Sequence, residues 1–308
     1  MPILGDTWEW VRDRYHDYRA PVHRYTFEAP ETTFQFHARG LGDMMILKQV
    51  GRAIQSYISV HGDPELGTVV IACGAMEPAF RPDEGDRNLY WWWSFGELDE
   101  RPGQYLDHYL RKTTVEPDLV LCLSEQCQRE ARQAGYETLL LPLGTLAFEP
   151  LGFDRTGLGY AGSERHKGAA KEAPVLGPYR ESESFEWVSR FSFPEQLNIW
   201  YNTKLLTFGL HREGQRRWGM VNNRVFETLA SGTPLVLERH PTVEDVLGFE
   251  YPYQTSSEAE TRELVREIRS NPEATLEEFR EFSERVRNEH SYEQRIRTLI
   301  DELATVRC

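Results

Sequence analysis

Phe34-Gln35-Phe36-His37-Ala38 opens the part of the chain that decides its fold, and Arg39-Gly40-Leu41-Gly42 follows it. The first run has the character of a strand, and the second, with two glycines, predicts a turn. From Asp43 to Tyr57 apolar residues recur at helical spacing, at Met44, Leu47, Val50 and Ile54. The three segments together predict a strand, a turn and a helix.

The same alternation continues to about residue 149. Short apolar strands are expected at 68–73, 88–93, 119–123 and 138–141, with helices near 103–112 and at 125–134. Continuous apolar strands separated by helices indicate a parallel sheet that is covered on both faces. Residues 1–32 are aromatic and charged, and their pattern assigns them no role.

A second series begins after a linker at 150–156. Its expected strands are 157–162, 185–191, 204–209 and 233–237, and its expected helices are 194–201, 222–231, 257–269, 276–288 and 291–306. We therefore expect two domains, 1–149 and 150–308, each an α/β unit. Ligands of such sheets bind at the carboxyl ends of the strands, so both units are expected to direct loops into a shared cleft.

Composition narrows the class of protein. The 308 residues are 40% hydrophobic and 27% charged, as in a globular protein, and carry a net charge of −14. That charge weighs against a broad nucleic-acid-binding surface, although it leaves room for a narrow basic groove. Cys73 and Cys122 lie in apolar runs and are expected to be buried free thiols. No segment has the length of a membrane span or the layout of a signal peptide, so we expect a cytoplasmic protein.

The most informative segment for function is Asn222-Asn223-Arg224-Val225-Phe226-Glu227-Thr228-Leu229-Ala230-Ser231-Gly232-Thr233-Pro234. On a helical wheel its polar side chains fall on one arc and its apolar ones on the other, and Gly232 ends the helix. A carboxylate can accept both hydroxyls of a ribose, and a guanidinium can bind a diphosphate. The competing interpretation is a surface helix on which Arg224 and Glu227 merely pair with each other.

The pattern Asn-x-Arg-x-Phe-Glu-x-Leu-Ala-x-Gly-x-Pro resembles the donor-site helix of CgeB-like and other group 1 GT-B glycosyltransferases. The segments Glu289-His290-Ser291-Tyr292-Glu293-Gln294-Arg295, Leu141-Pro142-Leu143-Gly144 and Tyr160-Ala161-Gly162-Ser163 resemble other parts of these proteins in the same order. The resemblance covers about residues 138–300. It implies an α/β fold of two Rossmann-like domains facing a cleft, with Glu227 on the donor ribose and Arg224 near the diphosphate, beside Asn223 and the Gly162-Ser163 loop. Many retaining relatives carry a second glutamate where this chain has Gly219, so the stereochemical outcome is not carried over.

The segment Gly40-Leu41-Gly42-Asp43 is the second candidate site. Glycines allow a ligand close to the backbone, and the start of the helix offers unpaired N–H groups. It also resembles the opening loop of heptosyltransferase-like GT-B enzymes, which implies that Asp43 is the acceptor base. An ordinary helix N-cap is the alternative role of Asp43. His37 is the other candidate for acting on the acceptor.

Further candidates are basic or aromatic. Lys204 and Arg190 adjoin strand ends, where a cation can neutralise a leaving diphosphate. Arg216 and Arg217 lie in an expected loop, 211–218, directly before the donor helix. Of the three tryptophans at 91–93, one or two are expected in the core, with Trp93 as the candidate to line the cleft.

These observations indicate transfer of a hexosyl or pentosyl group from a nucleoside-diphosphate sugar, most commonly a UDP-sugar, to a hydroxyl acceptor. The acceptor is a glycan, a small molecule or a hydroxymethylated base in DNA, the last of which the acidic charge disfavours. No metal or bound cofactor is expected, since cationic side chains and helix dipoles take the role of a metal in this fold. The alternative is a nucleotide-sugar-binding or sugar-epimerising protein that keeps the fold without the transfer.

Overall fold

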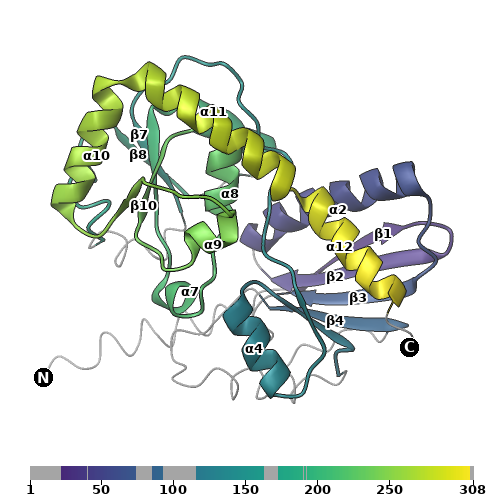
Figure 1. Ribbon diagram of the computed structural model, residues 1–308. Helices are drawn as coiled ribbons and strands as arrows, with labels where there is room; N and C mark the ends of the chain where they lie inside the picture. Colours follow the sequence, from purple (N-terminus) through teal and green to yellow (C-terminus); the bar gives the residue numbers. More distant parts are fainter. Residues whose placement is uncertain are drawn as a thin grey trace, which may run out of the picture.

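The computed structural model describes residues 22–39, 41–73, 85–92, 116–162, 173–189, 191 and 193–305. Two sheets organise these residues, one formed before residue 141 and one after residue 157 (Figure 1). Helices pack against both sheets, which confirms the predicted α/β class.

The first sheet has the strand order β1-β2-β3-β4-β5-β6. Its strands are β1 (Val22–Glu28), β2 (Thr32–Arg39), β3 (Gly67–Cys73), β4 (Arg87–Trp92), β5 (Leu119–Cys122) and β6 (Thr138–Leu140). The pairs from β2 to β6 are parallel, as expected, whereas β1 pairs antiparallel with β2. The sequence analysis did not predict β1, although Arg24-Tyr25-Thr26-Phe27-Glu28 alternates polar and aromatic residues, a pattern typical of a strand with one exposed face.

Helix α2 (Leu41–His61) packs on β1 and β2, and helix α4 (Glu125–Gln133) packs on β5 and β6. The prediction of a turn through Leu41-Gly42 is wrong, because α2 already begins at Leu41. Asp43 therefore lies inside the first turn of α2 and is not its N-cap. The helix also runs beyond Tyr57 to His61, and Gly62 follows it with a positive φ of 85°, which suits a residue without a Cβ.

The second sheet has the order β11-β10-β9-β7-β8, and all its pairs are parallel. Its strands are β7 (Leu158–Ala161), β8 (Phe185–Val188), β9 (Leu206–Gly209), β10 (Leu235–Glu238) and β11 (Gln254–Thr255). The chain leaves β7 toward β8 on one side and returns to β9 on the other. This reversal creates a topological switch point between β7 and β9, which is where open parallel sheets bind their ligands.

The helices of the second unit are α6 (Pro194–Thr203), α7 (Glu213–Arg217), α8 (Asn223–Ala230), α9 (Val243–Leu247), α10 (Glu258–Ser270) and α11 (Pro272–Glu289). Helix α8 packs between β9 and β10 on one side and α6 and α11 on the other. The prediction that 211–218 is a loop is wrong, because this stretch contains α7. The short elements α9 and β11 were not predicted.

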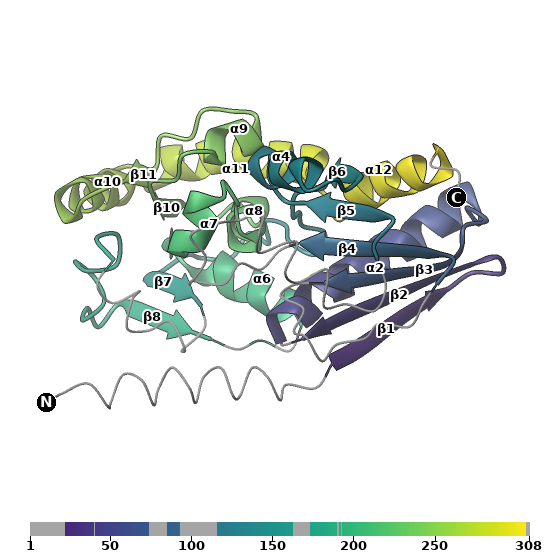
Figure 2. The same ribbon diagram turned by 90° about the horizontal axis from the view of Figure 1, so that it is seen from below.

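The last helix, α12 (Tyr292–Thr305), returns to the first unit and packs along α2 (Figures 1 and 2). A bridge between Thr145 and Ser291 lies at the start of this return, and Arg87 of β4 donates to the carbonyl of Leu303 at 2.7 Å. The C-terminal end of the chain thus ties the two units together.

The core confirms several expectations about individual residues. Cys73 and Cys122 are buried free thiols, and so is Cys127. Trp91 and Trp92 are fully buried, and Trp91 Nε1 donates to the carbonyl of Leu141 at 3.2 Å. Over the described residues, no helix is long and apolar enough to cross a membrane.

Candidate functional site

Helix α8 is buried on nearly every side, including its polar arc. Glu227, Thr228 and Ser231 are each at most 1% exposed. The polar arc is therefore not open to solvent at these three residues, because helices α6 and α11 pack against α8. The glycine stop is present, since Gly232 follows the helix with a φ of 65°.

The carboxylate of Glu227 is the central feature of this helix. Its Oε1 accepts from Asn223 Nδ2 at 2.9 Å and from Gln49 Nε2 at 3.5 Å. Its Oε2 is buried and has no hydrogen-bond partner among the described residues. Burial raises the pKa of Glu227 to about 6, against the opposing effects of Asn223, Arg224 and Gln49. A buried carboxylate oxygen without a hydrogen-bond donor lowers the stability of the fold. Two hydroxyl groups of a ligand would supply the missing donors.

Arg224 connects this helix to the end of β7. Its Nη1 donates to the hydroxyl of Tyr160 at 3.2 Å, and its guanidinium lies 5.7 Å from the centre of the Tyr160 ring. The Tyr160 ring in turn packs against Gly162, where a Cβ would lie 2.2 Å from a ring carbon. The structure thus brings Arg224 and Gly162 together through Tyr160, and the alternative in which Arg224 merely pairs with Glu227 is not the arrangement found.

His211 lies just after β9, on the other side of the switch point. The backbone N–H of Asn222 donates to His211 Nε2 at 3.2 Å, which places the ring proton on Nδ1. Nδ1 is buried and has no hydrogen-bond partner within the described part of the chain. Burial, then His240, Arg224 and Arg216, hold the pKa of His211 well below its usual range. His211 is thus a neutral donor beside two guanidinium groups.

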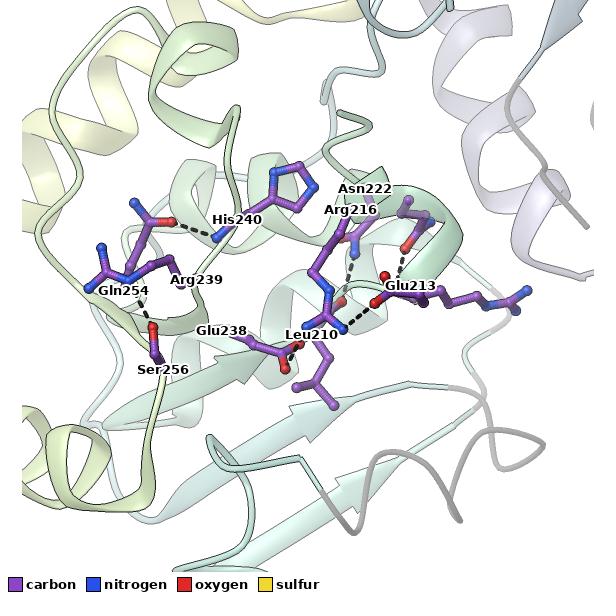
Figure 3. Close-up of polar contacts among 11 residues, drawn as sticks. Leu210, Glu213, Arg216, Asn222, Glu238, Arg239, His240, Gln254 and Ser256 are labelled. Atoms are coloured by element: carbon purple, nitrogen blue, oxygen red, sulfur yellow. Dashed lines mark hydrogen bonds and ion pairs between the residues drawn. The ribbon is translucent and has the colours of Figure 1, made fainter. Parts of the chain in front are cut away.

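Figure 3 shows the neighbouring ends of β10 and β11, where Arg216 lies between two carboxylates. Arg216 pairs with Glu213 and with Glu238, each at 2.7 Å. The ring of His240 lies 4.2 Å from that of His211, and burial lowers the pKa of His240 to about 4. Both rings are therefore neutral near pH 7, and Arg216 belongs to an ion-pair network at the rim of the site. Arg217 is exposed.

Lys204 does not join these residues. It precedes β9 and caps the end of α6, so it lies at the opposite, amino-terminal edge of the parallel sheet. Its Nζ pairs with Glu186 at 2.5 Å and lies 5.3 Å from the Trp200 ring. The placement of Lys204 at the donor diphosphate is corrected accordingly.

The first unit contributes candidates of a different kind. His37 is buried on β2, and burial together with Arg24 lowers its pKa to about 4, so its ring is neutral at pH 7. Asp43 and Gly42 occupy the first turn of α2. Gly40, Trp93, Ser163 and Arg190 lie outside the described residues.

Gly219 lies between the two units. Its φ is 66°, and a Cβ there would lie 3.1 Å from Cγ2 of Thr242. The residue before it, Trp218, accepts a hydrogen bond at its carbonyl from Ser124 Oγ of the first unit at 2.6 Å. The position that holds a glutamate in many retaining relatives is therefore a tightly held glycine in this chain.

The sequence pattern did not identify Gln49, Tyr160 or His211 as residues of the candidate site. Helical spacing marked Leu47 and Val50 on α2, but nothing in the pattern indicated that Gln49 between them is fully buried. His211 carried a signal that could have been used, since it follows a predicted strand at its carboxyl end. Among the described residues, no group of three or more potential metal ligands of the His, Cys, Asp and Glu types occurs.

Comparisons with known proteins agree with this geometry. Residues 164–301, somewhat less than half of the chain, match the family model described as glycosyl transferase-like. No curated protein sequence matches the chain. The predicted resemblance to group 1 glycosyltransferases in the C-terminal half is thereby confirmed, while the finer likeness to CgeB-like proteins stays a prediction.

Solved structures establish the fold. The chain is similar to an α,α-trehalose-phosphate synthase (UDP-forming) from Burkholderia vietnamiensis, with a TM-score of 0.52, 12% identity, and coverage of 93% of this chain and 90% of the synthase. It is also similar to TarM of S. aureus in complex with fondaparinux, α-GlcNAc-glycerol and UDP, with a TM-score of 0.51 and 8% identity. That match covers 83% of this chain and 59% of TarM, so the chain spans less than two thirds of TarM. The predicted GT-B fold is confirmed.

Proposed function

We propose that this protein is a glycosyltransferase that moves a sugar from a nucleoside-diphosphate sugar to a hydroxyl acceptor. The observation that carries the proposal is the buried carboxylate of Glu227, whose Oε2 has no partner in the described structure. A carboxylate in this state matches the paired hydroxyls of a ribose, which are neutral donors. UDP is bound in the TarM structure and is the product given in the name of the trehalose-phosphate synthase, which favours a uridine nucleotide as the donor.

The diphosphate lies, in this proposal, at the switch point between β7 and β9. The amino end of α8 directs its dipole there, and Arg224 supplies a guanidinium. His211 Nδ1–H supplies a neutral donor in the same neighbourhood. Gly162 allows the Tyr160 ring, which Arg224 contacts, to pack at the end of β7, since a side chain at position 162 would collide with that ring. These groups stabilise the negative charge that the diphosphate gains as it leaves.

The acceptor is activated from the first unit. Asp43, in the first turn of α2, is the proposed base, and His37 at the end of β2 is the second candidate. A hydroxyl on a glycan or small molecule is the proposed acceptor, because the net charge of −14 opposes approach of DNA. The two domains are proposed to span residues 1–149 and 150–308.

The test is a panel of nucleoside-diphosphate sugars, read by thermal shift and by isothermal titration calorimetry. The expected result is stabilisation by one nucleotide family, lost in Glu227→Ala and kept in the control Glu281→Ala, which changes an exposed glutamate of α11. Absence of binding to every member of the panel would overturn the proposal.

Release of the free nucleotide then separates the functional alternatives. Release that requires a glycan or small alcohol supports the proposed acceptor, and release that requires hydroxymethylated DNA replaces it with DNA. Donor binding without release in the presence of any acceptor would instead indicate a nucleotide-sugar-binding protein. Conversion of the sugar nucleotide itself would indicate an epimerase.

A further inference from the structure

Gln49 is a fully buried polar side chain from the first unit that reaches the carboxylate of the second. Its Nε2 donates to Glu227 Oε1 at 3.5 Å and to the carbonyl of Met45 at 3.3 Å. Its Oε1 accepts from the backbone N–H groups of Leu146 and Ala147, at 2.9 Å and 3.4 Å. All four hydrogen-bonding positions of the amide are thus used.

These four bonds join three parts of the molecule. Met45 belongs to α2, Leu146 and Ala147 belong to the connection between the sheets, and Glu227 belongs to α8. The amide therefore holds one carboxylate oxygen from outside the second unit. The other oxygen, Oε2, is buried and has no hydrogen-bond partner among the described residues.

We infer that Gln49 is a positioning residue, which orients Glu227 for the donor nucleotide and makes the donor site depend on the arrangement of the two units. The inference rests on the proposed function for the identity of the ligand. The coupling between Gln49 and Glu227 is independent of the proposed function, because it can be measured without a ligand.

The surroundings of Glu227 explain why the Gln49 amide can affect the ionisation of this carboxylate. Among the described residues, Arg224 is the charged group that acts on the carboxylate, and Asn223 is the other donor to Oε1. Tyr201 of α6 and Tyr292 of α12 also face it, and the pKa of each phenol is raised by burial and then by the charge of Glu227. Because Gln49 and Glu227 are both buried, loss of the amide N–H removes stabilisation of the ionised carboxylate.

Two substitutions separate this role from a purely structural one. Gln49→Met has a similar shape and loses all four hydrogen bonds. Gln49→Glu keeps an acceptor for Leu146 and Ala147 but replaces the donor to Glu227 with a second carboxylate. Gln133→Glu, at an exposed position of α4, makes the same change of charge away from the site and is the control.

The first experiment uses no ligand. Thermal stability is measured from pH 4 to pH 8 for wild type, Gln49→Met and Gln49→Glu, each with and without Glu227→Gln. Both Gln49 variants are expected to raise the folded pKa of Glu227 further. The stability gained by Glu227→Gln should therefore keep growing to a higher pH, and reach a larger final value, than it does when Gln49 is present. An unchanged pH profile, with stability merely lowered at every pH, would overturn the inference.

The second experiment measures UDP affinity by calorimetry. The expected loss is about tenfold in Gln49→Met, with a larger loss in Gln49→Glu and none in the Gln133→Glu control. In the Glu227→Gln background the Gln49→Met loss should disappear, because the two residues act as one unit. Wild-type affinity for UDP in Gln49→Glu would show that holding the connection is the whole role of Gln49 and would overturn the inference. Failure of wild type to bind any nucleotide would instead overturn the proposed function, while the pH profiles would still test the coupling.

Discussion

Ser124 Oγ donates to the carbonyl of Trp218 at 2.6 Å, and this bond joins the first unit to the segment that leads into α8. The same oxygen accepts from the N–H of Cys127 at 3.1 Å, so Ser124 is also the N-cap of α4. A single hydroxyl thus closes a helix end and anchors the loop before the candidate donor helix.

We expect Ser124→Ala to lower the free energy of unfolding by about 2 kcal/mol or more, because loss of the cap costs ~1 kcal/mol and the buried carbonyl loses its partner. The matched control is Ser257→Ala, which removes the N-cap of α10 and its bond to Glu260 but no contact between units. Urea denaturation of both variants measures the difference. Equal costs would show that the bond to Trp218 contributes nothing.

Glu227→Gln is expected to make the protein more stable at pH 8 and to weaken, but not abolish, donor binding. The folded pKa of Glu227 is about 6, above its ordinary value of 4.5, so the folded state holds the proton more tightly. Stability is therefore lost as the pH rises from about 4.5 through 6, by about 2 kcal/mol in all. The glutamine removes this loss, so the two proteins should be similar near pH 4 and differ at pH 8. Denaturation at the two pH values measures the effect, and a constant difference at both would contradict the assignment.

The donor role of His211 is tested by two amides of different length. Gln places its N–H near the position of Nε2, whereas Asn places it near Nδ1, which is the unmatched donor. We expect His211→Gln to weaken binding of the nucleoside diphosphate about tenfold or more and His211→Asn to retain most of the affinity. The corresponding nucleoside, which lacks phosphate, should bind all three proteins equally. Parallel losses for nucleoside and nucleotide would indicate that His211 only supports the fold.

The alternation of strands and helices was enough to predict the α/β class, because buried parallel strands are continuous apolar runs. It was not enough for β1, an exposed edge strand, or for α7, a short helix that begins at Glu213 in a polar stretch. The candidate site, too, was predictable from the sequence only in part. The spacing along one helix showed that Asn223 and Glu227 share a face, but the contact of Glu227 with Gln49 joins residues 178 positions apart. Contacts of that kind depend on how the units pack, which no local pattern encodes.

Lys204 shows that a residue next to a predicted strand can lie at either edge of the sheet. A lysine beside a strand was assigned to the donor diphosphate, but it precedes β9 and pairs with Glu186 at the far edge of the sheet. We expect Lys204→Met to leave nucleotide affinity unchanged and to cost at most about 1 kcal/mol of stability. Arg224→Met, which removes the contact with Tyr160, should weaken the affinity. Calorimetry on both variants tests the correction, and a comparable loss in Lys204→Met would reverse it.

A side chain at Gly219, including the glutamate of many retaining relatives, should destabilise the protein. Its φ of 66° disfavours any residue with a Cβ, at a cost of about 1 kcal/mol. Gly248 has a similar φ of 73° but open space around it, whereas a Cβ at Gly219 would press on Thr242 at 3.1 Å. Gly248→Ala therefore measures the backbone strain alone, and Gly219→Ala measures strain plus crowding.

We expect Gly219→Ala to be the more destabilised of the two in urea denaturation, and Gly219→Glu to be more destabilised still. The reason is that Thr242 cannot withdraw freely, since its Oγ1 donates to the carbonyl of Gly219 at 2.9 Å. Equal costs for the two alanine variants would mean that the segment relaxes, and that a glutamate could be accommodated between the units. Costs that differ as expected would show that the packing of Gly219 against Thr242 excludes a glutamate at this position.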